Sequence, residues 1–385
     1  FKCPHCGENE GFDKESDIMD VWFDSGSSHQ AVLAKRPYLG RPADVYLEGA
    51  DQYRGWFQSS LLTSVAQGLG APFKQIITHG WTVDGEGKKM SKSLGNGIAP
   101  QDIIQKYGAD ILRLWVASSD YHADIRISPE ILKQLSDNYR KIRNTARFCL
   151  GNLYDFNPDK DQVANESLEE LDKYALMKLD ELITTVRNSF EIYEYHTAAH
   201  AIHNFCVVDM SNFYFDVLKD RLYTSVAASA TRRAAQTVLY KILDALTLML
   251  TPILAFTADE IWRFMPHDAS RNADSPLFNE IPQADFIETD QAFMDKITLG
   301  ADGELYDFVK ANEAALPEIF ITSAVEVVSD KQDFSGDVEG LTVSVAKADG
   351  EKCERCWKFS STVGKDANHP HLCAHCAEVL AQMQQ

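Results

Sequence analysis

A glycine-flanked cluster of lysines and serines is the segment whose residue types are best suited to phosphate chemistry. It runs from Asp84 to Gly97, reads DGEGKKMSKSLGNG and contains Lys88, Lys89 and Lys92. Glycines allow a loop to close over a ligand. Movable lysine ammonium groups neutralise phosphate oxygens as negative charge builds up in a transition state. By residue types alone, however, such segments are more often solvated basic hairpins.

Four cysteines near the C-terminal end have the spacing of zinc ligands. Two Cys-x2-Cys pairs are separated by sixteen residues, and the four positions are Cys353, Cys356, Cys373 and Cys376. This spacing fits the four-thiolate zinc template. Four soft ligands that leave no coordination position open predict a structural Zn2+ ion, on which the folding of so short a segment would depend. Three nearby histidines are poorer candidates for the same role: His369, His371 and His375.

Two other groups contain metal-binding residue types but are incomplete. Cys3 and Cys6 form half a zinc site, whose partner thiols would lie upstream of residue 1, or the pair is a remnant. His196, His200 and His203 follow the spacing i, i+4, i+7, which puts three imidazoles on one helix face. No carboxylate motif accompanies them in the sequence, so we expect these histidines to pack and form hydrogen bonds rather than to bind a metal.

The elements that would position these residues change in type along the chain. Residues 1–128 alternate short β-rich runs with helical stretches, which is typical of a parallel α/β layer. Residues 129–298 carry apolar side chains at steps of three and four, the pattern of amphipathic helices in a bundle. Residues 299–350 indicate a small mixed α/β region, and residues 351–385 contain the zinc ligands. The predicted fold class is α/β followed by all-α, with a small C-terminal zinc module.

The composition excludes several classes of protein. The 385 residues are 45% hydrophobic and 24% charged, unlike those of a disordered, fibrous or low-complexity chain. The net charge is 37 − 57 = −20, so any contact with nucleic acid must come from a local basic patch. The most apolar run, residues 242–256, is too short to cross a membrane. The cysteine pairs favour metal binding in a reducing compartment, and we expect a cytoplasmic protein.

Four motifs in this sequence belong together. They read DVWFDSG at residues 20–26, LEGADQYRGWF at 47–57, KMSKS at 89–93 and YHADIRIS at 121–128. In these motifs the chain resembles the class I aminoacyl-tRNA synthetases, and the isoleucyl family among them. Parts of the motifs are shared with the valyl and leucyl families, but the DIRIS wording and the terminal cysteines favour the isoleucyl one. A valyl enzyme and a non-catalytic tRNA-binding relative are the alternatives.

The resemblance implies an ATP-dependent isoleucine–tRNA ligase. ATP, with Mg2+ bound to it, would activate isoleucine, and the isoleucyl group would pass to the isoleucine tRNA. Residues 1–128 would be the second half of a class I Rossmann-type catalytic domain, and residues 129–298 a helical anticodon-binding domain. The sequence lacks a His-x-Gly-His signature and does not begin with Met. We therefore expect the C-terminal part of a longer protein, without the editing domain and inactive on its own.

The resemblance also assigns roles to individual residues. Its catalytic residues would be Lys89 and Lys92, which stabilise the leaving pyrophosphate. Its ATP and adenylate contacts would be Glu48, Asp51, Gln52 and Lys92. The walls of its isoleucine side-chain pocket would be Trp22 and Trp56.

Three arginines form a stripe on one predicted helix, at Arg140, Arg143 and Arg147. Most charged stripes are merely solvated, so the spacing alone leaves both interpretations open. In the family that the chain resembles, this helix begins the anticodon-binding bundle, which implies salt-dependent contacts with tRNA phosphates. The implied partners are ATP, isoleucine and isoleucine tRNA, with no membrane, and we expect a monomer.

Overall fold

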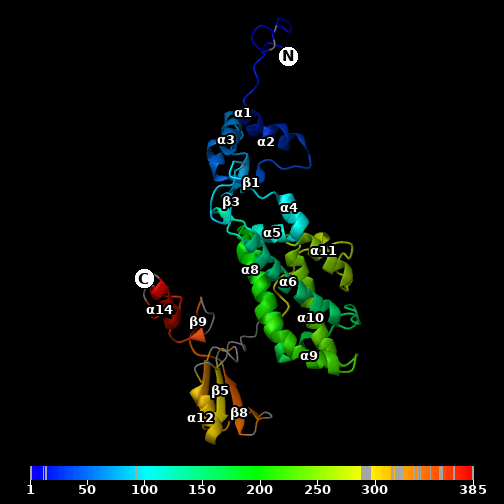
Figure 1. Ribbon diagram of the computed structural model, residues 1–385, viewed down its shortest axis with the longest axis vertical. Coiled ribbons are helices and arrows are strands. Elements are labelled where there is room, and N and C mark those ends of the chain that lie inside the picture. Colours follow the sequence, from blue (N-terminus) through cyan, green and yellow to red (C-terminus); the bar gives the residue numbers. More distant parts are fainter. Residues whose placement is uncertain are drawn as a thin grey trace. The chain divides into compact units, whose positions relative to one another are not determined.

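The computed structural model, drawn as a ribbon in Figure 1, divides into two compact units. The first unit is Phe1–Gln162, Leu182–Val226 and Leu239–Pro282, and the second is Val163–Glu181, Ala227–Val238 and Gln283–Gln385. The structure describes residues 2–11, 13, 15–91, 93–287, 296–313, 316, 322, 324–332, 334–335, 338, 340–346, 348–354, 359–366 and 369–383. Within these ranges, no helix is both long enough and apolar enough to cross a membrane.

The first unit begins with short helices and parallel strands. Its helices are α1 (Val21–Gly26), α2 (Ser28–Ala31), η1 (Leu33–Lys35), η2 (Ala50–Arg54), α3 (Trp56–Ala66), α4 (Pro100–Tyr107) and α5 (Ala109–Ala117). Its strands are β1 (Ala43–Gly49), β2 (Phe73–His79), β3 (Thr82–Val83) and β4 (Ile125–Arg126). β1 pairs in parallel with β2, and β3 pairs in parallel with β4. The parallel α/β arrangement predicted for this part of the chain is confirmed.

A helical bundle follows in the same unit. Its elements are α6 (Pro129–Asn152), α8 (Tyr195–Asn204), the π-helix η4 (Phe205–Tyr214), α9 (Phe215–Thr224) and α11 (Ala255–Phe264), with the C-terminal parts of α7 (Glu170–Glu191) and α10 (Ala230–Leu250). α6 packs along α8 and also contacts α11 and η4 (Figure 1). The large, fully buried side chains of the bundle include Ile202, Met210, Tyr214, Ile242, Leu246 and Trp262. The predicted change from α/β to all-α texture is therefore confirmed.

Two polar side chains of α5 join the α/β part to the bundle. Asp110 accepts hydrogen bonds from the backbone N–H and the hydroxyl of Thr257 at the start of α11, at 2.8 and 2.6 Å. Arg113 donates to the carbonyl oxygens of Ile253, at 2.9 Å, and Pro252, at 2.6 Å, which follow α10. These backbone groups lie at helix ends, where they have no partner within their own helix.

The second unit contains a mixed sheet and the cysteine-rich terminus. The sheet has the order β6-β5-β8-β7 and is built from β5 (Lys296–Ala301), β6 (Ala324–Val328), β7 (Phe334–Ser335) and β8 (Leu341–Ala346), with α12 (Gly303–Ala311) beside it. Leu299, Leu316 and Val327 form its core. The terminus has β9 (Glu351–Lys352) antiparallel to β10 (Phe359–Ser360), followed by α14 (Ala374–Met383). Two further 3-10 helices are η3 (Asn165–Ser167), which belongs to this unit, and η5 (Pro276–Phe278), which belongs to the first unit.

Candidate functional site

The lysine loop, the segment of residues 84–97, connects β3 to α4. Its first half folds back, because the backbone of Lys89 pairs with Val83 in an antiparallel bridge. Lys89 is exposed, whereas the Lys88 ammonium lies 2.6 Å from the Glu86 carboxylate. Lys92, the other predicted catalytic lysine, lies outside the described residues. Of the two predicted catalytic lysines, the structure thus describes Lys89, whose side chain is exposed and whose backbone pairs with Val83.

Two residues that sequence reasoning did not single out, Asp84 and Asn96, join the two ends of this loop. The Asp84 carboxylate accepts hydrogen bonds from the backbone N–H groups of Glu86 and Lys88 and from the side-chain amide of Asn96. The amide oxygen of Asn96 in turn accepts from the N–H of Ser91. The hydrogen bond from Asn96, followed by that from the Lys88 N–H, lowers the pKa of Asp84. The available signal was an Asp and an Asn at the two ends of a glycine-rich segment, since both residues favour such turns.

Met90 anchors the middle of the loop. It packs against an apolar cluster that includes Ile103, Ile111 and Trp115 of α4 and α5. The packing of Met90 therefore fixes the backbone next to its two neighbours in the sequence, Lys89 and Ser91. Because that cluster also contains Leu132 of α6, the position of the loop depends on the packing of the first bundle helix.

Glu48, Asp51 and Gln52 lie together where β1 ends and η2 begins. Glu48 accepts a hydrogen bond from the N–H of Gly49 at 3.0 Å, and its carboxylate lies 3.7 Å from Nε2 of His79. Gly49 and His79 are partners in the parallel β1–β2 pair, so these side chains gather at the carboxyl ends of two strands. In parallel α/β folds this edge is where ligands bind.

Gln52 has a structural role that limits what it can offer a ligand. Its side-chain oxygen accepts a hydrogen bond from the N–H of Trp56 at 2.9 Å, which satisfies a backbone donor at the start of α3. Its amide nitrogen lies 3.5 Å from the Asp51 carboxylate. Gln52 can therefore offer a bound molecule its amide nitrogen and the second lone pair of its oxygen.

The two predicted pocket tryptophans flank Gly55 but differ in exposure. Trp56 stacks on Tyr46 with ring centroids 4.2 Å apart, and its indole N–H donates to the carbonyl of Ser25 at 3.1 Å. Trp22 is 48% exposed. A Cβ atom added to Gly55 would lie only 3.3 Å from the Trp22 ring. Trp56 is thus fixed by packing, whereas Trp22 presents a face to solvent.

The three arginines all lie on the exposed side of α6, as their spacing predicts. Arg140 pairs with Asp137 at 2.6 Å, and the Arg143 guanidinium lies 3.5 Å from the Glu260 carboxylate. For Arg147, the described part of the chain shows no carboxylate partner. Arg143 and Arg147 also line a hollow of about 270 Å³ between α6 and α11. The stripe is therefore partly neutralised by neighbouring acids.

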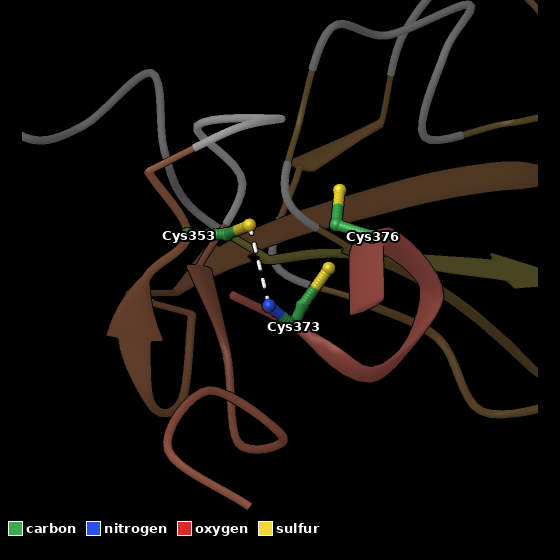
Figure 2. A group of neighbouring side chains, drawn as sticks. All are labelled: Cys353, Cys373 and Cys376. Carbon is green, nitrogen blue, oxygen red and sulfur yellow. Dashed lines mark hydrogen bonds between the residues drawn. The ribbon is translucent and has the colours of Figure 1, made fainter. Parts of the chain in front are cut away.

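Three of the four terminal cysteines, Cys353, Cys373 and Cys376, lie close together (Figure 2). The Sγ atoms of Cys353, Cys373 and Cys376 all lie within 4.8 Å of one another, and all three residues are buried. The N–H of Cys373 donates to the Sγ of Cys353 at 3.3 Å. Thiolates bound about 2.3 Å from one Zn2+ ion would stand at comparable separations, so these residues fit the metal. Cys356, the fourth predicted ligand, lies outside the described residues.

Cys3 and Cys6, and the three histidines of α8, were the weaker metal candidates. The backbone N–H groups of Cys6 and His5 lie against the Cys3 thiol and lower its pKa, a geometry that suits a thiolate. Nδ1 of His196 lies 3.2 Å from the Glu194 carboxylate, and burial lowers the pKa of His203. In the described ranges, the terminal cysteines are the group of three or more ligating residues that could hold a metal ion. Of the three α8 histidines, His196 and His203 are partly buried and His200 is exposed.

Three known families match successive parts of the sequence. Residues 5–128 match the family described as tRNA synthetases class I (I, L, M and V). Residues 172–315 match the anticodon-binding domain of tRNA ligase, and residues 350–379 match the zinc finger found in FPG and IleRS. An isoleucine–tRNA ligase of Caldanaerobacter subterraneus is 51% identical over 99% of this chain. The chain therefore contains a class I tRNA synthetase segment, an anticodon-binding domain of tRNA ligases and this zinc finger, and over nearly its whole length it is similar to isoleucine–tRNA ligases.

Other relatives give the extent of this match. An isoleucine–tRNA ligase of Syntrophotalea carbinolica is 49% identical over 98% of the chain. The chain spans 44% of the length of both relatives. A leucyl enzyme of Agrobacterium radiobacter, solved with tRNA and LeuAMS, has a TM-score of 0.58 at 19% identity and covers 90% of this chain and 44% of its own. A methionyl-tRNA synthetase of Mycobacterium tuberculosis with methionyl-adenylate has a TM-score of 0.51 at 23% identity, over 63% of this chain and 48% of its own. Both solved structures share the fold.

Proposed function

We propose that this chain carries part of the machinery that attaches isoleucine to its tRNA. The observation that carries the proposal is the KMSKS motif in the α/β part of the chain. The chain is also 51% and 49% identical in sequence to two proteins named isoleucine–tRNA ligase. In the first step, the isoleucine carboxylate would attack the α-phosphorus of ATP, and Mg2+-bound pyrophosphate would leave. In the second step, a ribose hydroxyl of the tRNA would attack the adenylate carbonyl and release AMP.

The lysine loop supplies positive charge for the first step. Negative charge on the leaving pyrophosphate is best stabilised by donors that are already in place. Lys89 meets this requirement in part, because its backbone is tied to Val83 and its side chain is exposed. Lys92 is proposed to bind the same phosphates on the strength of the motif alone.

The group at the end of β1 is proposed to hold the adenylate. The Glu48 carboxylate, oriented by the N–H of Gly49, can accept a hydrogen bond from a ribose hydroxyl. Asp51 can do the same, and Gln52 can donate from its amide nitrogen while its oxygen binds the N–H of Trp56. Trp56 and Trp22 are proposed as the fixed and the solvent-facing walls of the isoleucine pocket.

The remaining parts are proposed to contact tRNA and to hold zinc. Arg140, Arg143 and Arg147 would contact tRNA phosphates. A Zn2+ ion would be held by Cys353, Cys356, Cys373 and Cys376, where it would supply structure and no chemistry because four thiolates fill its coordination sphere. We also propose that the protein acts as a monomer in the cytoplasm.

The decisive test is amino-acid-dependent ATP–pyrophosphate exchange on the full-length gene product. Isoleucine, valine, leucine and methionine are compared as substrates. We expect the highest kcat/KM with isoleucine, and a fall of about 100-fold or more in Lys89→Ala and Lys92→Ala. Glu86→Gln is the matched control, since it removes a charge from the same loop without touching either lysine.

Each other outcome identifies an alternative. Exchange that is strongest with valine would make the chain part of a valyl enzyme. No exchange with any of the four amino acids, in a protein that still binds tRNA in a filter assay, would favour the non-catalytic tRNA-binding relative.

A further inference from the structure

We propose that Asp84 and Asn96 form a latch that positions the lysine loop, and with it Lys89, over the phosphates of the nucleotide. This proposal rests on the proposed function. The two residues are positioning residues, since they would act on the substrate only through the loop that they hold. Neither residue belongs to the KMSKS motif, which lies between them in the sequence.

The latch satisfies hydrogen-bonding groups on both sides of the motif. On the first side, Oδ1 of Asp84 accepts from the N–H groups of Glu86, at 3.0 Å, and Lys88, at 2.8 Å. The same turn is closed by the N–H of Asp84, which donates to the carbonyl of Lys88 at 2.9 Å. On the other side, Oδ2 of Asp84 accepts from Nδ2 of Asn96 at 2.8 Å.

Asn96 carries the connection into the motif itself. Its Oδ1 accepts from the N–H of Ser91 at 2.9 Å, and its Nδ2 also lies 3.3 Å from the carbonyl of Lys89. One amide group therefore contacts the backbone on both sides of Met90. Met90 also packs against the apolar cluster of α4 and α5. The backbone of Lys89 is therefore held by the hydrogen bond from Asn96 and by the packing of the neighbouring Met90 side chain.

The roles of the two side chains are chemically distinct. A carboxylate only accepts hydrogen bonds, and position 84 meets three donors. An amide both accepts and donates, and position 96 meets the Ser91 donor and two acceptors, the Asp84 carboxylate and the Lys89 carbonyl. Asp84→Asn would set two NH2 groups against each other, and Asn96→Asp would set two carboxylates against each other. Exchanging both residues restores one donor facing one acceptor, and the carboxylate introduced at position 96 still accepts from Ser91; only the longer hydrogen bond to the Lys89 carbonyl is lost.

This complementarity makes a reciprocal exchange the test. The full-length gene product is compared with Asp84→Asn, Asn96→Asp and the double variant in pyrophosphate exchange, with Glu86→Gln as control. We expect each single variant to lower kcat by about 10- to 100-fold, because small misplacements of catalytic groups have effects of this size. KM for isoleucine and the melting temperature should stay close to wild type. The double variant should recover most of the lost rate.

Trypsin cleavage after Lys88 and Lys89 reports the latch independently of activity. We expect faster cleavage in both single variants and near-normal cleavage in the double variant and in Glu86→Gln. Single variants with wild-type exchange rates, or a double variant with the product of the two single losses, would overturn the latch. If the wild type shows no exchange, the proposed function fails, and unchanged cleavage in the single variants would then show that the latch is absent as well.

Discussion

Asp110 and Thr257 form a buried contact between elements that lie far apart in the sequence. One carboxylate oxygen of Asp110 accepts from both the N–H and the hydroxyl of Thr257, and both residues are less than a tenth exposed. The other carboxylate oxygen accepts from the N–H of Phe256 at 3.3 Å. A helix of the α/β part thereby caps a helix of the bundle, so these two parts of the first unit share one hydrogen-bonded joint.

Asp110→Ala should destabilise the protein by about 2–3 kcal/mol, since it leaves the buried donors of Thr257 unpaired. Chemical denaturation followed by circular dichroism would measure the free energy of unfolding. Asp102→Ala is the control, because Asp102 is an exposed first-turn residue of α4 whose loss should cost about 0.5 kcal/mol. Equal effects of the two substitutions would contradict a special role for the joint.

Arg147 should matter more for tRNA affinity than Arg140. Arg140 is already paired with Asp137, so a phosphate must displace that carboxylate before it gains the guanidinium. We expect Arg147→Ala to weaken tRNA binding and to lower the slope of log K against log salt by about 1. Arg140→Ala should change both quantities less. Filter binding between low and moderate salt measures them, and the reverse order would show that the ion pair does not determine the contact.

Removal of zinc should unfold the terminal module while leaving the bundle intact. Binding of a structural metal and folding of its site are coupled. Cys373→Ser should therefore lower the bound zinc and expose the β9–α14 segment to proteolysis. Cys149→Ser is the control, since Cys149 is buried in α6, where burial raises the pKa of its thiol. Full zinc content in Cys373→Ser, measured by elemental analysis, would exclude Cys373 as a ligand.

Acid should destabilise the first unit through His29. Its ring accepts a hydrogen bond from Arg41 and contacts Thr63, and burial, followed by the Arg41 charge, lowers its pKa from 6.5. A proton therefore binds the unfolded chain more tightly than the folded one. Stability from the neutral ring is complete above pH 6.5 and is lost as the pH falls below that value. His29→Gln should flatten this part of the stability profile, and an unchanged slope would mean that His29 does not contribute.

Local patterns in the sequence predicted several features correctly. The β-rich runs and apolar periodicity predicted parallel α/β structure followed by helices, because the repeat of two or of three to four follows from strand and helix geometry. The break between two successive helices of the α/β part, α4 and α5, was not predicted; they meet at Gly108, whose φ is +91°. Glycine adopts this left-handed conformation without the penalty that other residues meet, and composition does not reveal whether a given glycine does so.

The sequence alone determined the chemistry that this protein can offer. Lysines between glycines, paired cysteines and an arginine stripe are properties of residue type and spacing, and they are readable without coordinates. Tertiary structure decided which of these groups are held, neutralised or exposed. Asp84 meets Asn96, Arg143 meets Glu260 and Asp110 meets Thr257 only when the chain folds. Such contacts depend on distances between side chains that are remote in the sequence, and no local pattern encodes those distances.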